Sequence, residues 1–387
     1  MKYLYLYTIV LLAIIPASCK KPYNPKVAAV QSDYLVVEGV INSGQDSTVI
    51  HLSRTVPLTD SRKAIPELGA EVTVESDQNA IYILREIGNG EYASPFLNLD
   101  KTSKYHLHIK TQSGKEYISD FEPIKTNPPI DSVGFIQQNN GIQLYVNTHD
   151  PNNNTHYYRW DYAETWNFHA QYYSSYITDG TKLNIRTPEQ LIFTCFGNNI
   201  SNEIVLASSA KLTNDVIYQA PLTRVVSTSE KLETKYSILI KQYALTKEEY
   251  NFWQNLKKNT EQLGSIFDAQ PSEVPGNIRC VTDPSEPVLG YVGVTNIQQK
   301  RIFITNDQLP DTWSAIYPYH CELDSLLLAN KGGQNDVALF LIPLGSTEFA
   351  VGPIVDKRGN LLGYVASDAD CADCTIRGTT TIPAFWK

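Results

Sequence analysis

Short runs in which apolar and polar residues alternate cover most of the first third of the chain. Residues 105–109 (Tyr-His-Leu-His-Ile) alternate with a period of two, which is typical of a half-buried β-strand. Turn residues such as Asn42-Ser43-Gly44 separate these runs. Short strands divided by turns about every ten residues predict an immunoglobulin-like β-sandwich over residues 31–126. The other predicted strands in it are residues 35–41, 48–53, 70–74 and 81–84.

Two prolines mark the end of this predicted domain. Asn127-Pro128-Pro129 interrupts a strand ladder, because proline lacks the backbone N–H that a ladder requires. Strand patterns resume afterwards, and we expect a second, fibronectin type III-like β-sandwich over residues 130–387. Its clearest strands are residues 142–147, 156–162, 288–294 and 301–304.

The strand at residues 156–162 is the most aromatic part of the chain. Tyr158, Trp160 and Tyr162 fall on one face of it, and Arg159 and Asp161 fall on the other. We expect the three rings to fill the core of the second sandwich, as a strand tryptophan often does. The alternative is an exposed aromatic platform for a glycan or a protein partner.

Further aromatic residues follow in a segment that has the composition of a loop. Trp166, Tyr172, Tyr173 and Tyr176 lie close to Ser174, Ser175 and Gly180. Exposed tyrosine and tryptophan side chains are typical of binding surfaces. We therefore treat these four residues as candidate ligand-binding residues, with burial in the core as the alternative.

One helix is predicted, near residues 246–263. Thr246 and Glu249 form a capping box at its start, and Gly264 follows as a C-terminal cap. Tyr250, Trp253, Leu256 and Leu263 recur at helical spacing, so we expect them to pack against the second sandwich rather than to hold a cofactor. The predicted fold is thus mainly β: two β-sandwiches in tandem with a helical insertion.

The N-terminus has the pattern of a cleaved export signal. Lys2 precedes an apolar stretch at residues 3–15, which is short for a membrane span, and Ala17 and Ser18 stand directly before Cys19. This resembles the lipobox of bacterial lipoproteins, although Pro16 stands where leucine is usual. We predict a signal peptide at residues 1–18, lipidation of Cys19 and an extended tether over residues 19–30. The alternative is an ordinary signal peptide with an incidental cysteine.

The charge balance bears on the choice of partner. Removal of residues 1–18 takes away only Lys2, so 31 basic residues face 41 acidic ones in the processed chain. Nucleic acid is a poor partner for an acidic chain, because phosphate binding requires a basic surface.

Five cysteines remain besides Cys19, and an exported chain meets an oxidising compartment, in which disulfides form. We expect one bridge between Cys321 and a member of the closely spaced pair near the C-terminus, and another between Cys195 and Cys280. The alternative is that the pair forms a redox site or half of a zinc site. The candidate disulfide residues are Cys195, Cys280, Cys321, Cys371 and Cys374.

Sequence motifs of known enzymes are absent. There is no Gly-x-Ser-x-Gly elbow, no His-Glu-x-x-His, no P-loop and no dinucleotide fingerprint. His106 and His108 share one face of a strand as two metal ligands would, and Asp368, Asp370 and Asp373 carry oxygen ligands that suit calcium. We expect solvated side chains in both places, and predict no catalytic residues, no metal and no cofactor.

Several ordered motifs resemble a family of Bacteroidota lipoproteins that is known only as a domain of unknown function. The resemblance spans nearly the whole chain after the signal. It is carried by Cys-Lys-Lys-Pro-Tyr-Asn-Pro from Cys19, Leu-Val-Val-Glu-Gly from Leu35, His-Leu-Ser-Arg-Thr from His51, Pro-Pro-Ile-Asp-Ser-Val from Pro128, residues 259–268, Pro-Val-Leu-Gly-Tyr from Pro287, Lys-Arg-Ile-Phe-Ile from Lys300, Cys371-Ala-Asp-Cys374 and Pro383-Ala-Phe-Trp386.

This resemblance implies an outer-membrane lipoprotein that works beside a TonB-dependent β-barrel transporter, and it supplies no catalytic residues. Lys20 and Lys21 stand where surface lipoproteins often carry acidic residues, so both the cell surface and the periplasmic face stay open, and we prefer the surface. We expect a non-enzymatic accessory subunit of the transporter. The alternatives are a glycan- or ligand-binding lipoprotein and, third, a hydrolase whose carboxylates meet only in space.

Overall fold

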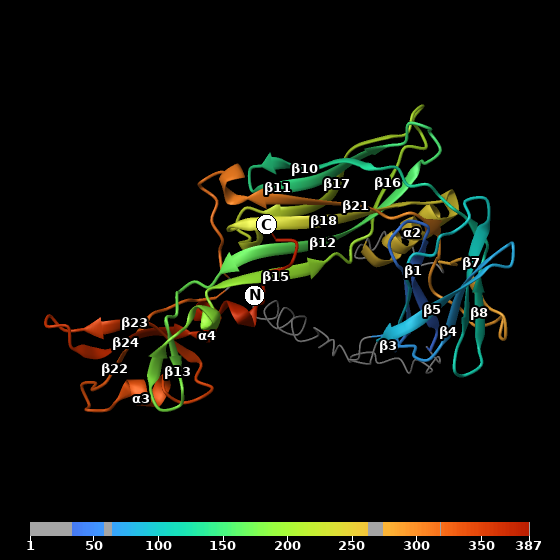
Figure 1. The fold of residues 1–387 in the computed structure, drawn as a ribbon. Coiled ribbons are helices and arrows are strands. Elements are labelled where there is room, and N and C mark those ends of the chain that lie inside the picture. The colour runs from blue at the N-terminus through green and yellow to red at the C-terminus, as the bar shows by residue number, and fades with distance from the viewer. Residues whose placement is uncertain (1–32, 58–63, 262–273, 318, 387) are drawn as a thin grey trace, which may run out of the picture.

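The computed structural model describes residues 33–57, 64–261, 274–317 and 319–386, so Cys19 and the tether lie outside the described residues. The prediction of a mainly β chain is confirmed. Two β-sandwiches lie side by side with helix α2 (Lys247–Glu261) close to where they meet, and a smaller C-terminal module extends from the far end of the second sandwich (Figure 1). Within the described residues, no helix is long and apolar enough to cross a membrane.

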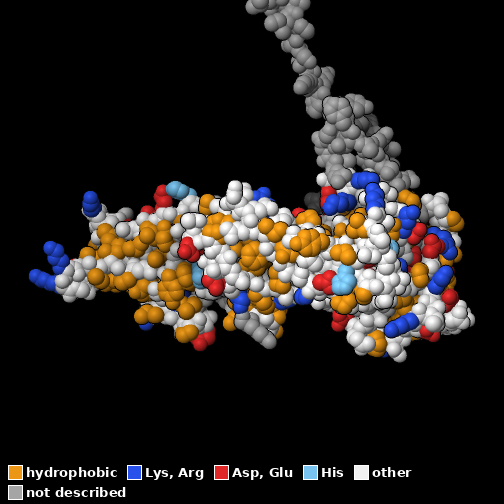
Figure 2. All heavy atoms as spheres, turned by 90° about the horizontal axis from the view of Figure 1, so that it is seen from above, with side chains coloured by type: hydrophobic (Ala, Val, Ile, Leu, Met, Phe, Trp, Pro, Cys, Tyr) orange, Lys and Arg blue, Asp and Glu red, His pale blue; other side chains and the backbone are white. Residues whose placement is uncertain are grey.

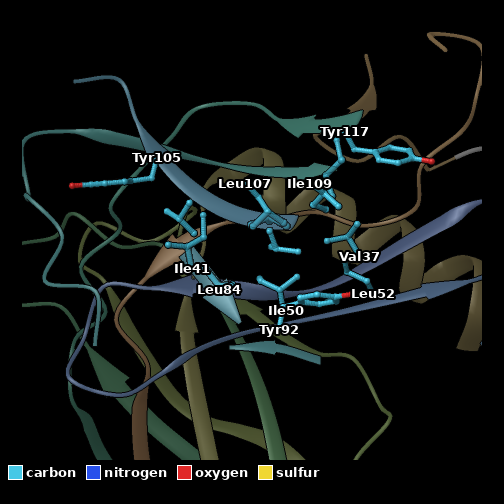
Figure 3. Close-up of a cluster of buried hydrophobic side chains, with 14 of the residues drawn as sticks. Val37, Ile41, Ile50, Leu52, Leu84, Tyr92, Tyr105, Leu107, Ile109 and Tyr117 are labelled. Carbon is cyan, nitrogen blue, oxygen red and sulfur yellow. The ribbon is translucent and has the colours of Figure 1, made fainter. Parts of the chain in front are cut away.

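The first sandwich is one continuous hydrogen-bonded sheet that folds over its own core. The sheet turns from one layer to the other at strand β5, because the first half of β5 pairs with β4 in one layer and its second half pairs with β6 in the other. Side chains from both layers converge in Figure 3, where Val37, Ile50 and Leu52 face Leu107 and Ile109. The early strands are β1 (Leu35–Asn42), β2 (Thr48–Arg54), β3 (Ile65–Pro66), β4 (Glu71–Ser76), β5 (Ile81–Gly88), β6 (Glu91–Ser94), β7 (Lys104–Lys110), β8 (Glu116–Ser119) and β9 (Glu122–Pro123).

A late segment of the chain completes this sandwich, which corrects the predicted domain boundary. Strand β19 (Ile278–Cys280) pairs with β8, and β20 (Val294–Thr295) pairs in parallel with β1. Val288 and Val292 between them enter the first core. The prediction placed all of this segment in a second domain spanning residues 130–387. Pairing between strands so far apart in the sequence has no local turn signal, so the strand pattern alone did not reveal it.

A buried arginine ties the late segment to the early strands. The Arg54 side chain is 8% exposed, and its guanidinium forms ion pairs with Glu67 at 2.5 Å and with Glu286 at 3.3 Å. The Tyr117 hydroxyl and the Lys115 ammonium donate hydrogen bonds to the two oxygens of the Glu286 carboxylate, at 2.7 and 2.6 Å. The charge of Arg54 is therefore compensated inside the sandwich, as a buried charge requires.

The second sandwich packs two sheets face to face. One has the order β10-β11-β17, and the other has the order β15-β12-β18-β21, with β16 also paired to β12. Tyr158 and Trp160 are fully buried between them and Tyr162 is 5% exposed, so the prediction of an aromatic core is confirmed. The strands are β10 (Ile130–Gln138), β11 (Gly141–His149), β12 (Tyr157–His169), β15 (Thr194–Ile200), β16 (Val205–Ser208), β17 (Val216–Val226), β18 (Lys235–Ala244) and β21 (Gln298–Thr305).

Helix α2 begins where the capping box predicted. The Glu249 backbone N–H donates to Thr246 Oγ1 at 3.2 Å, while Leu263 and Gly264 lie outside the described residues. Tyr250 and Trp253 pack onto a small core that contains Val40 of the first sandwich and Tyr243 of the second. The helix therefore stabilises the contact between the two sandwiches, in addition to packing on the second one as predicted.

The C-terminal module has its own core, built on Val337, Leu341, Ala350 and Ala366. It contains a three-stranded sheet of order β22-β24-β23, and a short two-stranded hairpin from the middle of the chain packs on the same core. The module was not predicted as a separate body. Its elements are β13 (Tyr176–Thr178), β14 (Leu183–Ile185), β22 (Asp324–Leu327), α3 (Asp336–Phe340), β23 (Glu348–Val355), β24 (Leu361–Asp368) and α4 (Ala369–Ala372). Four single-turn 3₁₀ helices lie in the connections, at η1 (Pro188–Gln190), η2 (Glu230–Leu232), η3 (Asn306–Gln308) and η4 (Cys374–Ile376).

Two disulfides hold the C-terminal tail. Cys321 pairs with Cys371, which confirms one predicted bridge, and Cys374 pairs with Cys195 of β15. The predicted Cys195–Cys280 bridge is wrong. Cys280 is buried in the first sandwich as a free thiol, whereas Cys195 lies in a small core at the end of the second. Cys371 and Cys374 thus bond separate partners and do not form a dithiol pair with each other.

A buried amide network fixes the linker between the two sandwiches. The fully buried side-chain amide of Gln242 donates to Asn127 Oδ1 at 3.0 Å and to the Pro128 carbonyl at 2.9 Å, and its Oε1 accepts from Trp160 Nε1 at 2.9 Å. Asn127 in turn donates through Nδ2 to the carbonyls of Gln242 and Asn296. One glutamine therefore ties the linker to the core of the second sandwich.

Replacing this glutamine tests the network. Gln242→Leu keeps a similar volume but leaves the Trp160 indole N–H and Asn127 Oδ1 without their hydrogen-bond partner, so we expect the free energy of unfolding to fall by roughly 3 kcal/mol. All five tryptophans stand at or after position 160, so urea denaturation followed by tryptophan fluorescence reports on this part of the chain. The control is Gln299→Leu, which loses one exposed hydrogen bond to Asp46 and is expected to cost less than about 0.5 kcal/mol. Equal losses in the two variants would contradict the network's role.

The disulfide pairing has a direct chemical test. Alkylation of unfolded, unreduced protein is expected to label only Cys280 among the five internal cysteines, and the folded protein should resist labelling because that thiol is buried. Cleavage before Asp373 separates Cys371 from Cys374, so mass spectrometry can assign each bridge. A peptide that links Cys195 to Cys280 would overturn the pairing.

Candidate functional site

A cavity of about 460 Å³ lies where the two sandwiches and helix α2 meet. The lining residues come from four elements and one loop. Strand β1 contributes Glu38, β12 contributes residues 159 and 161–163, β18 contributes Lys241 and Tyr243, α2 contributes Trp253, and residues 200–204 run from the end of β15 along the remaining wall. Its volume is in the range of small-molecule sites, which often lie between domains. We take this cleft as the candidate site.

Strand geometry explains why charged side chains line this cleft. Tyr158 and Trp160 point into the core of the second sandwich, so Arg159 and Asp161 belong to the opposite face of β12. Asp161 and Lys241 are register partners on neighbouring strands. The alternation that builds the core therefore also presents a mixed set of charges on the outer face.

The Arg159 guanidinium lies between two aromatic rings. Its central carbon is 4.5 Å from the centroid of Tyr243 and 4.2 Å from the centroid of Trp253. Stacking of this kind stabilises a cation and fixes the plane of the guanidinium. The ion pair of Arg159 with Asp161 is long, at 3.4 Å, and the Arg159 Nε atom is buried without a hydrogen-bond partner in the described chain.

The carboxylates of the cleft already have partners within the chain. The Tyr162 hydroxyl donates to Glu203 at 3.2 Å, and Glu38 lies 3.3 Å from His51 Nδ1. Burial raises the pKa of Tyr243, and the neighbouring Asp161 raises it further, so this hydroxyl stays protonated. Lys241, by contrast, makes no side-chain ion pair or hydrogen bond within the described residues.

A buried carboxyl lies behind the cleft. Burial raises the pKa of Glu249 on α2 to about 7, although the charge of Arg159 acts in the opposite direction. Trp253 Nε1 donates to Glu249 Oε1 at 3.5 Å, and the backbone at Gly293 passes so close that a Cβ there would lie 2.3 Å from Glu249 Oε2. Glu249 does not line the cavity, so its role in this geometry is to seat the helix.

A second buried carboxyl belongs to the first sandwich. Burial raises the pKa of Glu122, while hydrogen bonds from the Tyr291 hydroxyl at 2.6 Å and Asn277 Nδ2 at 3.3 Å act to lower it. Tyr291 packs against Phe252 of α2, with ring centroids 5.6 Å apart. These contacts hold the helix against the first sandwich and leave the carboxyl enclosed.

The four predicted ligand-binding aromatics do not form one surface. Trp166 packs in the second sandwich and donates to Glu230 at 3.1 Å, and the Tyr172 hydroxyl donates to the Cys321 carbonyl at 3.2 Å. Tyr173 is 45% exposed and meets Phe193 edge to face, whereas Tyr176 packs on Tyr364 in the C-terminal module. Each ring thus serves a different packing contact, and the structure does not bring the four candidate residues together.

The histidines and acidic residues considered as metal ligands have other contacts. His108 lies between Glu75 at 2.9 Å and Glu116 at 2.7 Å; burial lowers its pKa, but these hydrogen bonds outweigh burial and raise it. His106 stacks on Phe121. Asp373 accepts from Thr375 in a local turn. No group of three metal-ligating side chains occurs within the described part of the chain.

Sequence reasoning missed the residues that matter most in the cleft. Arg159 and Asp161 were placed on the outer face of their strand, but nothing in the sequence indicated that this face meets helix α2 and strand β1. Lys241 and Tyr243 share a face of β18 with period-two spacing. Strand β18 is the neighbour of the charged face of β12, so this alternation is the signal in the sequence that could have identified Lys241 and Tyr243.

Comparisons with known proteins identify the family of the chain. No curated protein gives a significant match. Among solved structures, a segment of two fibronectin type III domains from chicken tenascin is similar, with 12% sequence identity and a TM-score of 0.15, over 54% of this chain and 90% of that one. A family model described as "Domain of unknown function (DUF4249)" matches residues 20–301, which is well over half of the chain. The protein therefore belongs to this family of unknown function.

Proposed function

We propose that the protein is a non-enzymatic lipoprotein of the Bacteroidota outer membrane that is anchored through Cys19 and docks onto a TonB-dependent β-barrel transporter as an accessory subunit. The export signal and the lipobox-like cysteine support the proposed location in the cell envelope. The two disulfides support it independently, because structural disulfides form in oxidising compartments such as the cell envelope.

The observation that carries the docking proposal is the apolar surface of the C-terminal module. Figure 2 shows hydrophobic side chains gathered along the end of the molecule that this module forms. The apolar row (Leu328, Val355, Leu361 and Leu362) lies at one end of its three-stranded sheet. Val355 of β23 is the register partner of Leu361 of β24, and the N–H of Leu328, directly after β22, donates to the Leu362 carbonyl. All four side chains are exposed.

Exposed apolar side chains grouped in this way mark surfaces that bind a protein or a membrane. A further group, Leu339, Phe340 and Leu344, is exposed on α3 and the turn after it. The Cys321–Cys371 disulfide joins the chain before β22 to helix α4, and the Cys195–Cys374 disulfide ties the end of the module to β15 of the second sandwich, so the module can present its surface without losing its fold. A body of this kind acts by contact, which fits an accessory role beside a transporter.

The anchor has a simple test. A Cys19→Ser variant is expected to lack the acyl mass and to leave the outer-membrane fraction. Each buried methylene of an acyl chain contributes about 0.8 kcal/mol to membrane binding, so loss of the chains removes the attachment. Fractionation and intact-mass measurement are the readouts. A variant that still sediments with membranes at the same mass as the unsubstituted protein would refute lipidation.

The docking surface is tested by introducing charged residues into it. Val355→Glu with Leu361→Glu places two carboxylates side by side on the apolar row, and recovery of a β-barrel protein by affinity capture in mild detergent is expected to fall at least about tenfold, since buried unpaired charges are costly. The matched control is Ile81→Glu with Ile83→Glu, two exposed residues on β5 of the first sandwich. If neither the unsubstituted protein nor the control recovers a β-barrel, or if the row variant recovers as much as the control, the transporter proposal fails.

A further inference from the structure

We propose that the cleft between the two sandwiches binds the oxyanion of a small organic molecule, a carboxylate or a phosphate, through Arg159 and Lys241. This site is separate from the apolar row and goes beyond the docking function. It adds a direct ligand-binding activity at the contact between the two domains, at residues to which no role has been assigned.

The first argument is the geometry of Arg159. Tyr243 and Trp253 lie within 4.5 Å of its central carbon, so its planar group is held by stacking and its N–H donors are presented at its edge. A guanidinium fixed in this way matches the two oxygens of a carboxylate or phosphate, which lie in the plane of the donors. Little side-chain entropy remains to be lost when an anion binds.

The second argument is unused hydrogen-bonding capacity. The Arg159 side chain is only 14% exposed, and its buried Nε atom has no hydrogen-bond partner within the described residues. The contact with Asp161 at 3.4 Å is an ion pair longer than a charge-assisted hydrogen bond. Buried donors are almost always paired in folded proteins, so an arginine in this state calls for an external acceptor.

Lys241 supplies the second cation. It stands on β18 directly across from Asp161, two residues before Tyr243, and its ammonium has no partner among the described side chains. The carboxylates of the cleft outnumber the cations, but Glu203 accepts from Tyr162, Glu38 lies against His51, and Asp161 adjoins both Arg159 and Tyr243. The capacity left for a ligand is therefore cationic.

The size and walls of the cleft define the rest of the ligand. A volume of about 460 Å³ suits a molecule of the size of an acidic sugar or a short peptide. Ring edges and the Ala163 and Ile204 side chains offer apolar contact, and Ser201 and Asn202 offer hydrogen bonds. Because Glu38 comes from the first sandwich, a ligand in the cleft would touch both domains.

The competing explanation is that Arg159 serves only to hold helix α2 against the second sandwich, through its contacts with Trp253 and Tyr243. This explanation gives Lys241 no function, so Lys241→Gln separates the two. Lys241 is not part of a packed ion pair, and its replacement is expected to leave folding unchanged. The matched control is Lys211→Gln, an exposed lysine away from the cleft.

Isothermal titration of the full-length protein is the measurement, with glucuronate, trialanine and inorganic phosphate as anionic probes and with glucose and trialanine amide as probes that lack the oxyanion. At least one anionic probe is expected to bind with one site per chain, and glucose and trialanine amide, which lack the oxyanion, should not bind. A charge-assisted hydrogen bond contributes about 1.5–3 kcal/mol, so Lys241→Gln should weaken binding about tenfold or more while Lys211→Gln does not.

The probe that binds identifies the source of the oxyanion: glucuronate indicates an acidic sugar, trialanine a peptide carboxylate, and phosphate a phosphorylated ligand. Arg159→Lys, which keeps the charge but loses the planar fork, is expected to weaken the same probe, with thermal unfolding as a check on its fold. The proposal is overturned if no anionic probe binds, or if a probe binds Lys241→Gln as tightly as it binds the unsubstituted protein.

Discussion

The spatial relation of the two sandwiches depends on one buried amide. Gln242 is fully buried near the end of β18, where its side chain satisfies the linker residues Asn127 and Pro128 and the indole N–H of Trp160 at the same time. An unpaired polar group at this depth would cost far more than an ordinary hydrogen bond contributes, so the network has one satisfied arrangement. That arrangement fixes where the chain leaves one domain and enters the next.

The cleft is a consequence of this constraint. Because the linker is held, strand β1 stays beside helix α2, and Val40 joins Tyr243 and Leu245 in a small core between the domains. The same contact places Trp253 over Arg159 and brings Glu38 to the edge of the cavity. A site made of residues from two domains is preorganised only when the domains cannot move freely, and here the buried amides and the helix supply that rigidity.

The parts of the structure that the sequence predicted are those encoded locally. Period-two alternation identified most strands and placed Tyr158, Trp160 and Tyr162 in the core, and the capping box located the start of α2. The parallel pairing of β20 with β1 and the burial of Glu286 beside Arg54 join residues more than two hundred positions apart, so no local pattern signals them. The predicted pairing of Cys195 was wrong for the same reason, because spacing along the chain does not reveal which cysteines share a core.

The net charge of the chain and the charge of its cleft point to different partners. A formal charge of −9 argues against nucleic acid, because binding a polyanion draws on the field of a whole surface. A small anion responds instead to charges within a few ångströms, since salt screens interactions over about 8–10 Å. In the cleft the acidic groups are engaged by Tyr162, His51 and Arg159, while Lys241 and the edge of Arg159 have capacity left. An acidic protein can therefore hold an anion, provided that the cations are local and the carboxylates are already satisfied.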